Sequence, residues 1–178
     1  MFLRRWKLSG AAVLFLLVSC GRTSSDSIAD FLKNKQAAVF VFLAPDCPLS
    51  QNYTRTLNEL RTQFQPQRVE FYAVFAADAA VDDFVSHYKI TFPVVLDRDF
   101  KLADFFGATK TPEVFAVDSN GRGIYKGAID NWAPELGQHR TVITEHYLLD
   151  ALNSLVQHEA VRTKQTNAVG CLIERARR

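Results

Sequence analysis

The chain has 178 residues, of which 48% are hydrophobic and 12% aromatic. This is enough apolar material for one well-buried domain of ordinary size. The 21 basic and 19 acidic residues give a formal net charge of +2 without a basic stripe interleaved with aromatic residues. We therefore expect no nucleic-acid partner. The sequence also lacks a phosphate-binding glycine loop, a G-x-S-x-G elbow and an H-E-x-x-H zinc motif, which removes several enzyme classes.

Residues 1–19 have the features of an export signal. The positively charged start MFLRRWKLSG precedes the apolar run AAVLFLLV, which is too short to span a bilayer comfortably. Its end, Leu17-Val18-Ser19-Cys20, resembles the lipobox of bacterial lipoproteins, in which the cysteine carries lipid and begins the mature chain. The alternative is an ordinary signal peptide whose cysteine is incidental.

The lipobox implies a division of the chain into three parts. We expect a lipoprotein signal peptide over residues 1–19, a small polar tether over residues 20–27 and one folded domain over residues 28–178. Lipid on Cys20 would hold the domain at the periplasmic or other extracytoplasmic face of a bacterial cell envelope, as a membrane anchor without a spanning helix.

Strand and helix patterns alternate after the tether. Ser27 is placed to cap a short helix that runs through Lys33. Residues 37–44, AAVFVFLA, form a continuous run rich in Val and Phe, which is typical of a strand buried on both faces. Pro48 then fits the first turn of a helix. The apolar stripe of that helix comprises Tyr53, Leu57, Leu60 and Phe64.

The alternation continues through the rest of the chain. The runs VFAVD and GIYKG flank an Asn-Gly turn and predict a hairpin. Gly107 is placed to end a short helix, because glycine tolerates positive φ. Further strands are expected over residues 69–77, 92–96 and 168–173, and further helices over residues 81–88, 99–106 and 141–157. Parallel strands first and antiparallel strands last predict an α/β fold, a three-layer α/β/α sandwich with a mixed central sheet.

Cys47 stands where the strand over residues 37–44 gives way to a helix, in the stretch VFLAPDCPLS. Backbone N–H groups and the positive end of the helix dipole stabilise a thiolate at such a place. Thiolate is the species that attacks disulfides and peroxides, so we predict that Cys47 is a redox nucleophile. A buried, inert cysteine is the alternative. We expect the neighbouring Asp46 to cap the helix; a carboxylate directed at the sulfur would raise the thiol pKa.

The dipeptide Thr111-Pro112 comes immediately before the hairpin's first strand. In this position the sequence resembles the thioredoxin superfamily, whose strand before the hairpin opens with a cis-proline lying against the active cysteine. The resemblance implies a thioredoxin-like fold and a cis Thr111-Pro112 bond. It also implies that the Thr111 backbone is an exposed docking edge for an extended substrate, so Thr111 and Pro112 are candidate substrate-binding residues.

Longer blocks narrow the resemblance to one family. APDCPLSQNY, the block from FPVVLDRDF to GAIDN, and the ending HYLLDALNSLV with AVGCLIE are similar to exported redoxins of the alkyl hydroperoxide reductase/thiol-specific antioxidant (AhpC/TSA) type. The resemblance extends from about Ala37 to Ile173. It implies an oxidoreductase that acts on thiols, disulfides or peroxide.

Two departures from the family pattern bear on the reaction. Peroxiredoxins surround their cysteine with Pro-x-x-x-Thr-x-x-Cys, and here Phe40 and Ala44 stand in place of the proline and the threonine. This puts efficient peroxide reduction in doubt. Ser50 stands where thioredoxins have the second cysteine of C-x-x-C, so rapid exchange through a local pair is excluded.

Cys171 is the remaining thiol if Cys20 carries lipid, and disulfides persist outside the cytoplasm. It is a candidate catalytic partner that resolves a sulfenic acid or mixed disulfide formed at Cys47. Alternatively, the two cysteines form a static bridge, which would close a loop of roughly 120 residues and contribute about 4–5 kcal/mol. A third possibility is that they never meet, because a bridge needs Cα atoms within about 7 Å.

These patterns predict a thiol-disulfide oxidoreductase or peroxiredoxin-like antioxidant that uses Cys47 and serves cell redox homeostasis without a cofactor. Its partners would be protein or small-molecule thiols and disulfides, peroxide, and the membrane through the lipid. The alternative is a non-catalytic thioredoxin-fold binding module, such as a copper carrier. Soft thiolates of Cys47 and Cys171 with one histidine would suit copper(I). His139 and His146 could share a helix face if the helix over residues 141–157 begins early enough.

Overall fold

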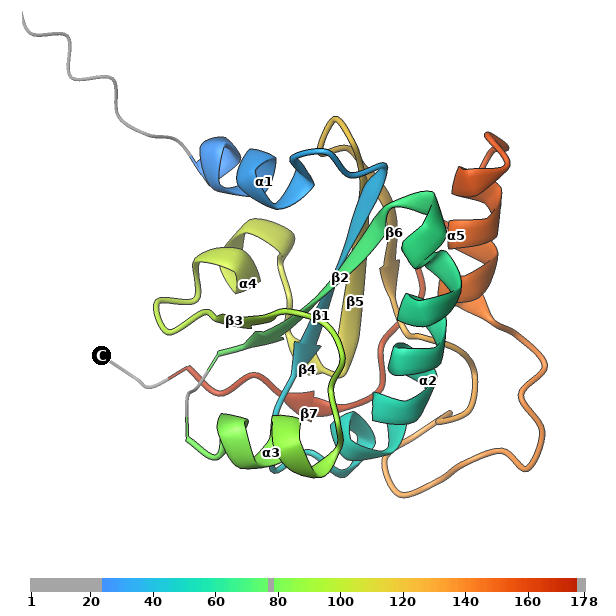
Figure 1. Ribbon diagram of the computed structural model, residues 1–178. Helices are drawn as coiled ribbons and strands as arrows, with labels where there is room; N and C mark the ends of the chain where they lie inside the picture. The colour runs from blue at the N-terminus through green and yellow to red at the C-terminus, as the bar shows by residue number, and fades with distance from the viewer. Residues whose placement is uncertain (1–23, 77–78, 176–178) are drawn as a thin grey trace, which may run out of the picture.

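The protein's computed structural model describes residues 24–76 and 79–175 (Figure 1). The expected signal peptide and Cys20 lie outside these residues. The helices are α1 (Ser24–Leu32), α2 (Pro48–Phe64), the 3-10 turn η1 (Gln65–Gln67), α3 (Val81–His87), α4 (Lys101–Phe106) and α5 (Tyr147–Val156). The strands are β1 (Ala37–Leu43), β2 (Val69–Phe75), β3 (Val94–Leu96), β4 (Lys110–Thr111), β5 (Glu113–Asp118), β6 (Gly123–Gly127) and β7 (Cys171–Leu172).

A five-stranded mixed sheet with the order β3-β2-β1-β5-β6 forms the centre of the molecule. β1 pairs in parallel with β2, and β2 with β3, whereas β5 is antiparallel to both β1 and β6. Helices α1 and α4 cover one face of this sheet, and α2, α3 and α5 pack on the other (Figure 1). The predicted three-layer α/β/α sandwich with a mixed sheet is therefore confirmed.

Strand β1 is the centre of the core, as its uninterrupted Val and Phe run predicts. All seven of its residues are buried. Val39 and Val41 pack on the side of α2 and α5, whereas Phe40 and Phe42 pack on the side of α1 and α4. On that second side the Phe42 ring meets Phe115 edge to face, with centroids 5.5 Å apart. Apolar packing on both faces fixes the position of the strand end that leads to Cys47.

Two predicted helix boundaries are wrong. Helix α1 begins at Ser24, so Ser27 lies inside it and is not its N-terminal cap, and the last residues of the expected tether are helical. Helix α5 begins at Tyr147, not at 141. The preceding segment is held by Asn131 instead: its Oδ1 accepts the N–H groups of Thr144 and Glu145 at 3.1 and 3.3 Å. These bonds satisfy backbone groups that a helix would otherwise use.

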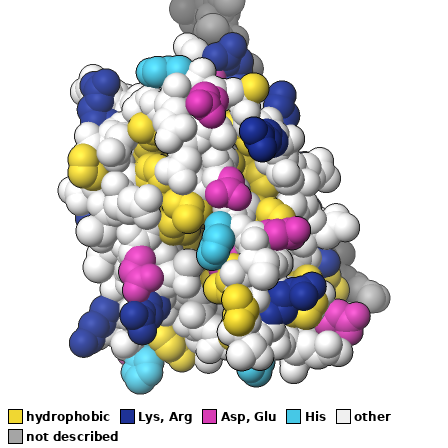
Figure 2. All heavy atoms as spheres, turned by 90° about the vertical axis from the view of Figure 1, so that its right-hand side faces the viewer, with side chains coloured by type: hydrophobic (Ala, Val, Ile, Leu, Met, Phe, Trp, Pro, Cys, Tyr) yellow, Lys and Arg dark blue, Asp and Glu magenta, His cyan; other side chains and the backbone are white. Residues whose placement is uncertain are grey.

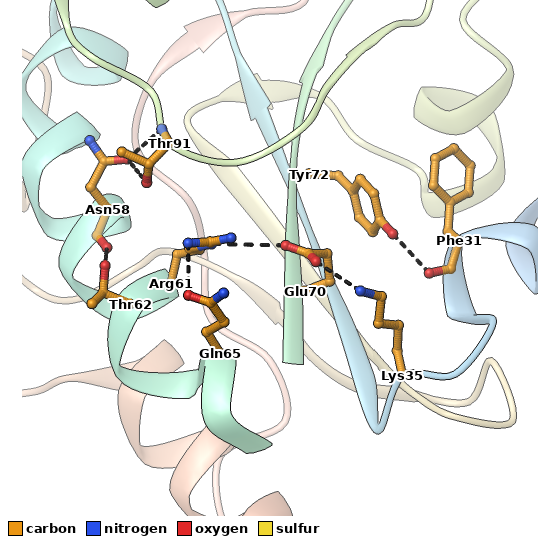
Figure 3. Close-up of polar contacts among 9 residues, drawn as sticks. All are labelled: Phe31, Lys35, Asn58, Arg61, Thr62, Gln65, Glu70, Tyr72 and Thr91. Atoms are coloured by element: carbon orange, nitrogen blue, oxygen red, sulfur yellow. Dashed lines mark hydrogen bonds and ion pairs between the residues drawn. The ribbon is translucent and has the colours of Figure 1, made fainter. Parts of the chain in front are cut away.

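A polar cluster joins helices to the sheet at the amino ends of β1 and β2 (Figure 3). Lys35 Nζ donates to Glu70 Oε2 at 2.9 Å, and Arg61 lies 3.9 Å from the other carboxylate oxygen of Glu70. Tyr72 donates to the carbonyl oxygen of Phe31 at 2.9 Å, which ties β2 to α1. These contacts lie at the opposite end of β1 from Cys47, so the carboxyl end of the sheet is left for the chemistry.

The surface over α2 and α5 carries charges of both signs. Figure 2 shows Lys and Arg side chains interspersed with Asp and Glu on this face, with apolar side chains between them. Within residues 24–76 and 79–175, no helix combines the length and the apolar character needed to cross a bilayer.

Candidate active site

Cys47 lies at the junction of β1 and α2, where the sequence predicts it. It is the N-cap residue of the 17-residue helix α2, with extended backbone angles (φ −87°, ψ 113°), and its side chain is fully buried. Its carbonyl oxygen accepts the N–H of Gln51 at 3.1 Å, which begins the helix. The thiol therefore faces the first-turn N–H groups of α2, the place that favours a negative charge.

The predicted capping role of Asp46 is wrong. The N-cap position of α2 belongs to Cys47 and not to Asp46, whose side chain is exposed. The charge of Asp46 acts on Cys171 instead, where it raises the pKa of the thiol.

Ser50 has a structural role at the position of the missing second cysteine. It is fully buried, and its hydroxyl oxygen accepts the backbone N–H of Ala44 at 3.2 Å. The bond closes the turn between β1 and α2, so it steadies the backbone that carries Cys47.

The bond between Thr111 and Pro112 is cis, as the resemblance implies. The Cys47 thiol donates a hydrogen bond to the carbonyl oxygen of Thr111 at 2.9 Å, so the dipeptide lies directly against the cysteine. The expectation of an exposed docking edge is wrong, however. Thr111 is only 3% exposed and Pro112 is buried, because β7 pairs antiparallel with β4 and sets Thr111 opposite Cys171.

Cys171 is brought to Cys47 by this pairing. The predicted edge strand near the C-terminus is present but short, covering Cys171–Leu172. The two cysteines are free thiols that lie in one small cluster, where Cys171 packs beside the buried Cys47. Of the three possibilities left open by the sequence, the one in which they never meet is therefore wrong.

The two thiols have pKa values displaced in opposite directions. Burial raises the pKa of Cys47, but hydrogen bonds from the Cys171 thiol, from the backbone N–H groups of Ser50 and Cys171, and from the Thr111 hydroxyl outweigh burial. The pKa of Cys47 is consequently below its ordinary value. Burial, followed by the hydrogen bond to Cys47 and the charges of Cys47 and Asp46, raises the pKa of Cys171 to about 12.

These opposite shifts give the two thiols different roles. Cys47 is the thiol that loses its proton first, and its thiolate then accepts from Cys171. When protonated, Cys47 donates to Thr111 instead. One thiolate beside one protonated thiol is the arrangement that thiol-disulfide exchange requires.

A loop that the sequence does not single out completes the enclosure of Cys47. Ala133 and Trp132 pack in the small cluster around the cysteine, together with Leu49 and Val169. Asp130, 3% exposed, anchors this loop, and its Oδ1 accepts both the Tyr53 hydroxyl at 2.6 Å and the Trp132 N–H at 2.8 Å. Burial and the Asp130 carboxylate raise the pKa of Tyr53, so the phenol remains a donor. The signal in the sequence is a Trp two residues after an Asp, in a loop rich in Asn, Pro, Gly and Gln.

Among the residues that the structure describes, no histidine joins Cys47 and Cys171 as the third ligand of a copper site. His139 stacks on Trp132 with ring centroids 5.5 Å apart, and His146 precedes α5, so the two do not share a helix face. Over the ranges the structure covers, no three His, Cys, Asp or Glu side chains converge on a position for a metal ion.

Known proteins resemble the chain in sequence and in fold. The sequence model of the AhpC/TSA family matches residues 16–125, a span that includes Cys47 and Thr111-Pro112 and ends before Cys171. Thiol-disulfide oxidoreductase ResA of Geobacillus thermodenitrificans is 28% identical over 116 residues, which are 59% of this chain and 67% of that protein. The protein of the same name from Bacillus anthracis is 34% identical over 68 residues, covering 37% of this chain and 39% of its own.

Solved structures share the fold over most of the chain. A hypothetical protein of Sinorhizobium meliloti has a TM-score of 0.69 at 25% identity, covering 81% of this chain and 82% of its own. An uncharacterized conserved protein of Geobacillus kaustophilus has a TM-score of 0.74 at 23% identity, with 84% and 82% covered. The α/β fold is thioredoxin-like. The family match over more than half of the sequence shows that the chain belongs to the AhpC/TSA family.

Proposed function

We propose that the protein exchanges thiols and disulfides with protein or small-molecule partners, using Cys47 as nucleophile and Cys171 as resolving thiol. The observation that carries this proposal is that β7 sets Cys171 opposite Thr111 and beside Cys47, and the opposite displacement of the two pKa values supports it. A static bridge would not need one thiol prepared as an anion and the other as a proton donor.

The exchange has two steps. In the first, the Cys47 thiolate attacks one sulfur of a partner disulfide, a mixed disulfide forms, and the partner's other sulfur leaves as a thiolate that takes up a proton. In the second, Cys171 loses its proton and attacks the Cys47 sulfur, which releases the partner's remaining thiolate. The partner disulfide is thereby reduced to two thiols, and the two electrons come from the Cys47 and Cys171 thiols, which are oxidised to a disulfide.

The charge on Cys47 sets the order of these steps. While Cys47 is a thiolate, its hydrogen bond and its charge both raise the pKa of Cys171. Formation of the mixed disulfide removes that charge, so the pKa of Cys171 falls, although burial, the largest cause of its elevation, still acts on it. Cys171 is therefore activated by completion of the first step.

Peroxide is a poorer oxidant for this site. The methyl group of Ala44 packs against the cluster around Cys47, at the place that peroxiredoxins fill with a threonine hydroxyl. We expect hydrogen peroxide to oxidise Cys47 slowly, and a Cys47 sulfenic acid would be resolved by Cys171 in the same way.

We propose an extracytoplasmic location at a membrane, with lipid on Cys20. The lipobox-like Leu17-Val18-Ser19-Cys20 supports this, and so does the use of a cysteine pair that can form a disulfide, which suits an oxidising compartment. Incorporation of radiolabelled palmitate into the expressed chain, and its loss in Cys20→Ser, tests the anchor separately from the redox chemistry.

The central experiment follows the disulfide itself. The reduced protein is treated with oxidised glutathione, digested without reductant and examined by mass spectrometry. We expect a Cys47–Cys171 disulfide that dithiothreitol removes. Cys47→Ser should lose all exchange with glutathione, whereas Cys171→Ser should stop at glutathione bound to Cys47. Exchange that survives in Cys47→Ser, or a wild-type protein whose two thiols stay reduced, would refute the proposal.

A further inference from the structure

The tail of the chain covers the edge next to Cys47 by backbone contacts. Strand β7 pairs with β4 through Thr111 opposite Cys171 and Lys110 opposite Leu172. The Ile173 N–H extends this ladder to the Thr109 carbonyl at 2.9 Å, and Lys110 Nζ donates to the Ala168 carbonyl at 2.9 Å. The Leu172 side chain, in contrast, is 71% exposed. The tail thus lies on β4 as an added strand, in the manner of a bound extended peptide.

The residue before Cys171 is fitted closely to this edge. A Cβ built on Gly170 would lie 2.2 Å from the Thr111 carbonyl oxygen and 2.7 Å from its carbonyl carbon. Gly170 does not have a positive φ, so glycine is required here for close approach and not for its backbone conformation. Any strand that sets its cysteine against Cys47 in this register meets the same restriction.

We propose that residues 167–173 are an internal stand-in for the protein substrate. The substrate class is an extended polypeptide segment with a disulfide-bonded cysteine directly preceded by glycine, which displaces the tail from β4 and sets its sulfur against Cys47. The proposal rests on the function proposed above, since it requires Cys47 to be the nucleophile.

Competition for one edge couples the two steps of the exchange. With the tail displaced, the Cys47 thiolate attacks the substrate disulfide, and one substrate cysteine leaves as a thiolate. The other remains bound to Cys47 on β4. Return of the tail evicts this strand and brings Cys171 to the Cys47 sulfur, so the mixed disulfide breaks, the substrate is released as a dithiol and the Cys47–Cys171 disulfide forms. The product therefore leaves as the tail closes.

Tail displacement is tested with two glycine variants. In Gly170→Ala, the new Cβ meets the Thr111 backbone and weakens tail docking. Gly123→Ala is the matched control, because nothing lies within 4 Å of a Cβ at that position and its φ is not positive. We expect iodoacetamide to alkylate Cys47 about tenfold faster in Gly170→Ala than in wild type, as expected for an overpacked contact that costs about 1.4 kcal/mol. Gly123→Ala should match wild type. Equal rates in all three would refute a displaceable tail.

Substrate selectivity is tested without altering the tail's glycine. The peptide NAVGCLI, with its cysteine as a mixed disulfide to thionitrobenzoate, is added to the Cys171→Ser protein, and NAVVCLI is the control. Attack by Cys47 releases thionitrobenzoate and leaves the peptide on Cys47, which mass spectrometry identifies. We expect the glycine peptide to react at least about tenfold faster, because the valine side chain would clash with Thr111.

The outcomes separate this inference from the function on which it rests. If Cys47 reacts with the small reagent dithionitrobenzoate but treats both peptides alike, the stand-in proposal fails and the exchange function stands. If Cys47 reacts with neither the small reagent nor the peptides, both fail.

Discussion

The two cysteines are held by regions of opposite kind. Cys47 follows a strand whose seven residues are all buried and is the N-cap of a helix of 17 residues. Cys171 lies on a strand of two residues in a separate two-stranded sheet, outside the central sheet. The nucleophile is thus fixed by the core of the domain, and its partner by a short ladder of backbone hydrogen bonds.

This difference suits a two-step exchange. The first thiol must keep its place against the α2 N–H groups and Thr111 while partners come and go, because these neighbours contribute to its lowered pKa together with Cys171. The second thiol must withdraw to admit a partner and then return. We expect the tail to be less stable against local unfolding than the region around Cys47, because regions with few buried apolar contacts open before the core does.

The largest difference between the two regions is expected in the free energy of unfolding when a side chain is shortened in each of them. Leu57→Ala, at a fully buried position of α2, should lower the free energy of unfolding by about 2–5 kcal/mol, through lost apolar burial and the cavity left behind. Leu172→Ala, on the exposed side of the tail, should change it by less than about 0.5 kcal/mol. Urea unfolding followed by circular dichroism measures both. A loss in Leu172→Ala as large as that in Leu57→Ala would place the tail within the cooperative core and break the comparison.

Removal of the Cys171 thiol tests how far the pKa of Cys47 depends on the tail. In Cys171→Ala the sulfur of Cys47 loses a hydrogen-bond donor, and the pKa of Cys47 should rise because its thiolate is less stabilised. The measurement is the pH at which the alkylation rate of Cys47 is half of its maximum, which should move upward. A pH midpoint separates this effect from easier access, which would change the maximum rate.

Cys171→Ser supplies the matched control for that midpoint. A serine hydroxyl keeps a donor on the tail, so its midpoint should lie between those of wild type and Cys171→Ala. An unchanged midpoint in Cys171→Ala would mean that the backbone N–H groups of Ser50 and residue 171 and the Thr111 hydroxyl lower the pKa of Cys47 without the Cys171 thiol.

The region that holds Cys47, strand β1 and helix α2, could be predicted from the sequence almost in full. The apolar run over residues 37–44, Pro48 in the first helical turn and the stripe of Tyr53 and Leu57 are local signals, and each is confirmed. Even there, one assignment failed. The sequence places Asp46 well for capping, but only the three-dimensional structure shows that Cys47 holds the N-cap position and that the charge of Asp46 raises the pKa of Cys171.

The tail's arrangement could not be predicted in the same way. A strand of two residues has no periodicity to detect, and its partner Thr111 lies 60 residues away from Cys171. The close approach of Gly170 to Thr111 is likewise a long-range contact. The same holds for the Trp132 loop, whose anchor Asp130 finds its partner Tyr53 on α2. A fold recognised from local patterns thus leaves open which distant segment covers its active cysteine.

The smallest expected effect is that of the Asp46 carboxylate, which the sequence analysis predicted to cap α2. Asp46 raises the pKa of Cys171, so Asp46→Asn should lower that pKa and leave more Cys171 thiolate at neutral pH. With thionitrobenzoate preloaded on Cys47, the attack of Cys171 releases it, and we expect this release to be about two- to fivefold faster in Asp46→Asn, the effect of one exposed charge. The increase in release rate should disappear at a pH high enough to ionise Cys171 in both proteins.

The control for net charge is Asp82→Asn, which removes an exposed carboxylate from α3. An equal increase of the release rate in both variants would show a general effect of net charge. A slower release in Asp46→Asn would instead mean that Asp46 helps to position the tail. The Cys47 region and the tail would then be coupled through this side chain.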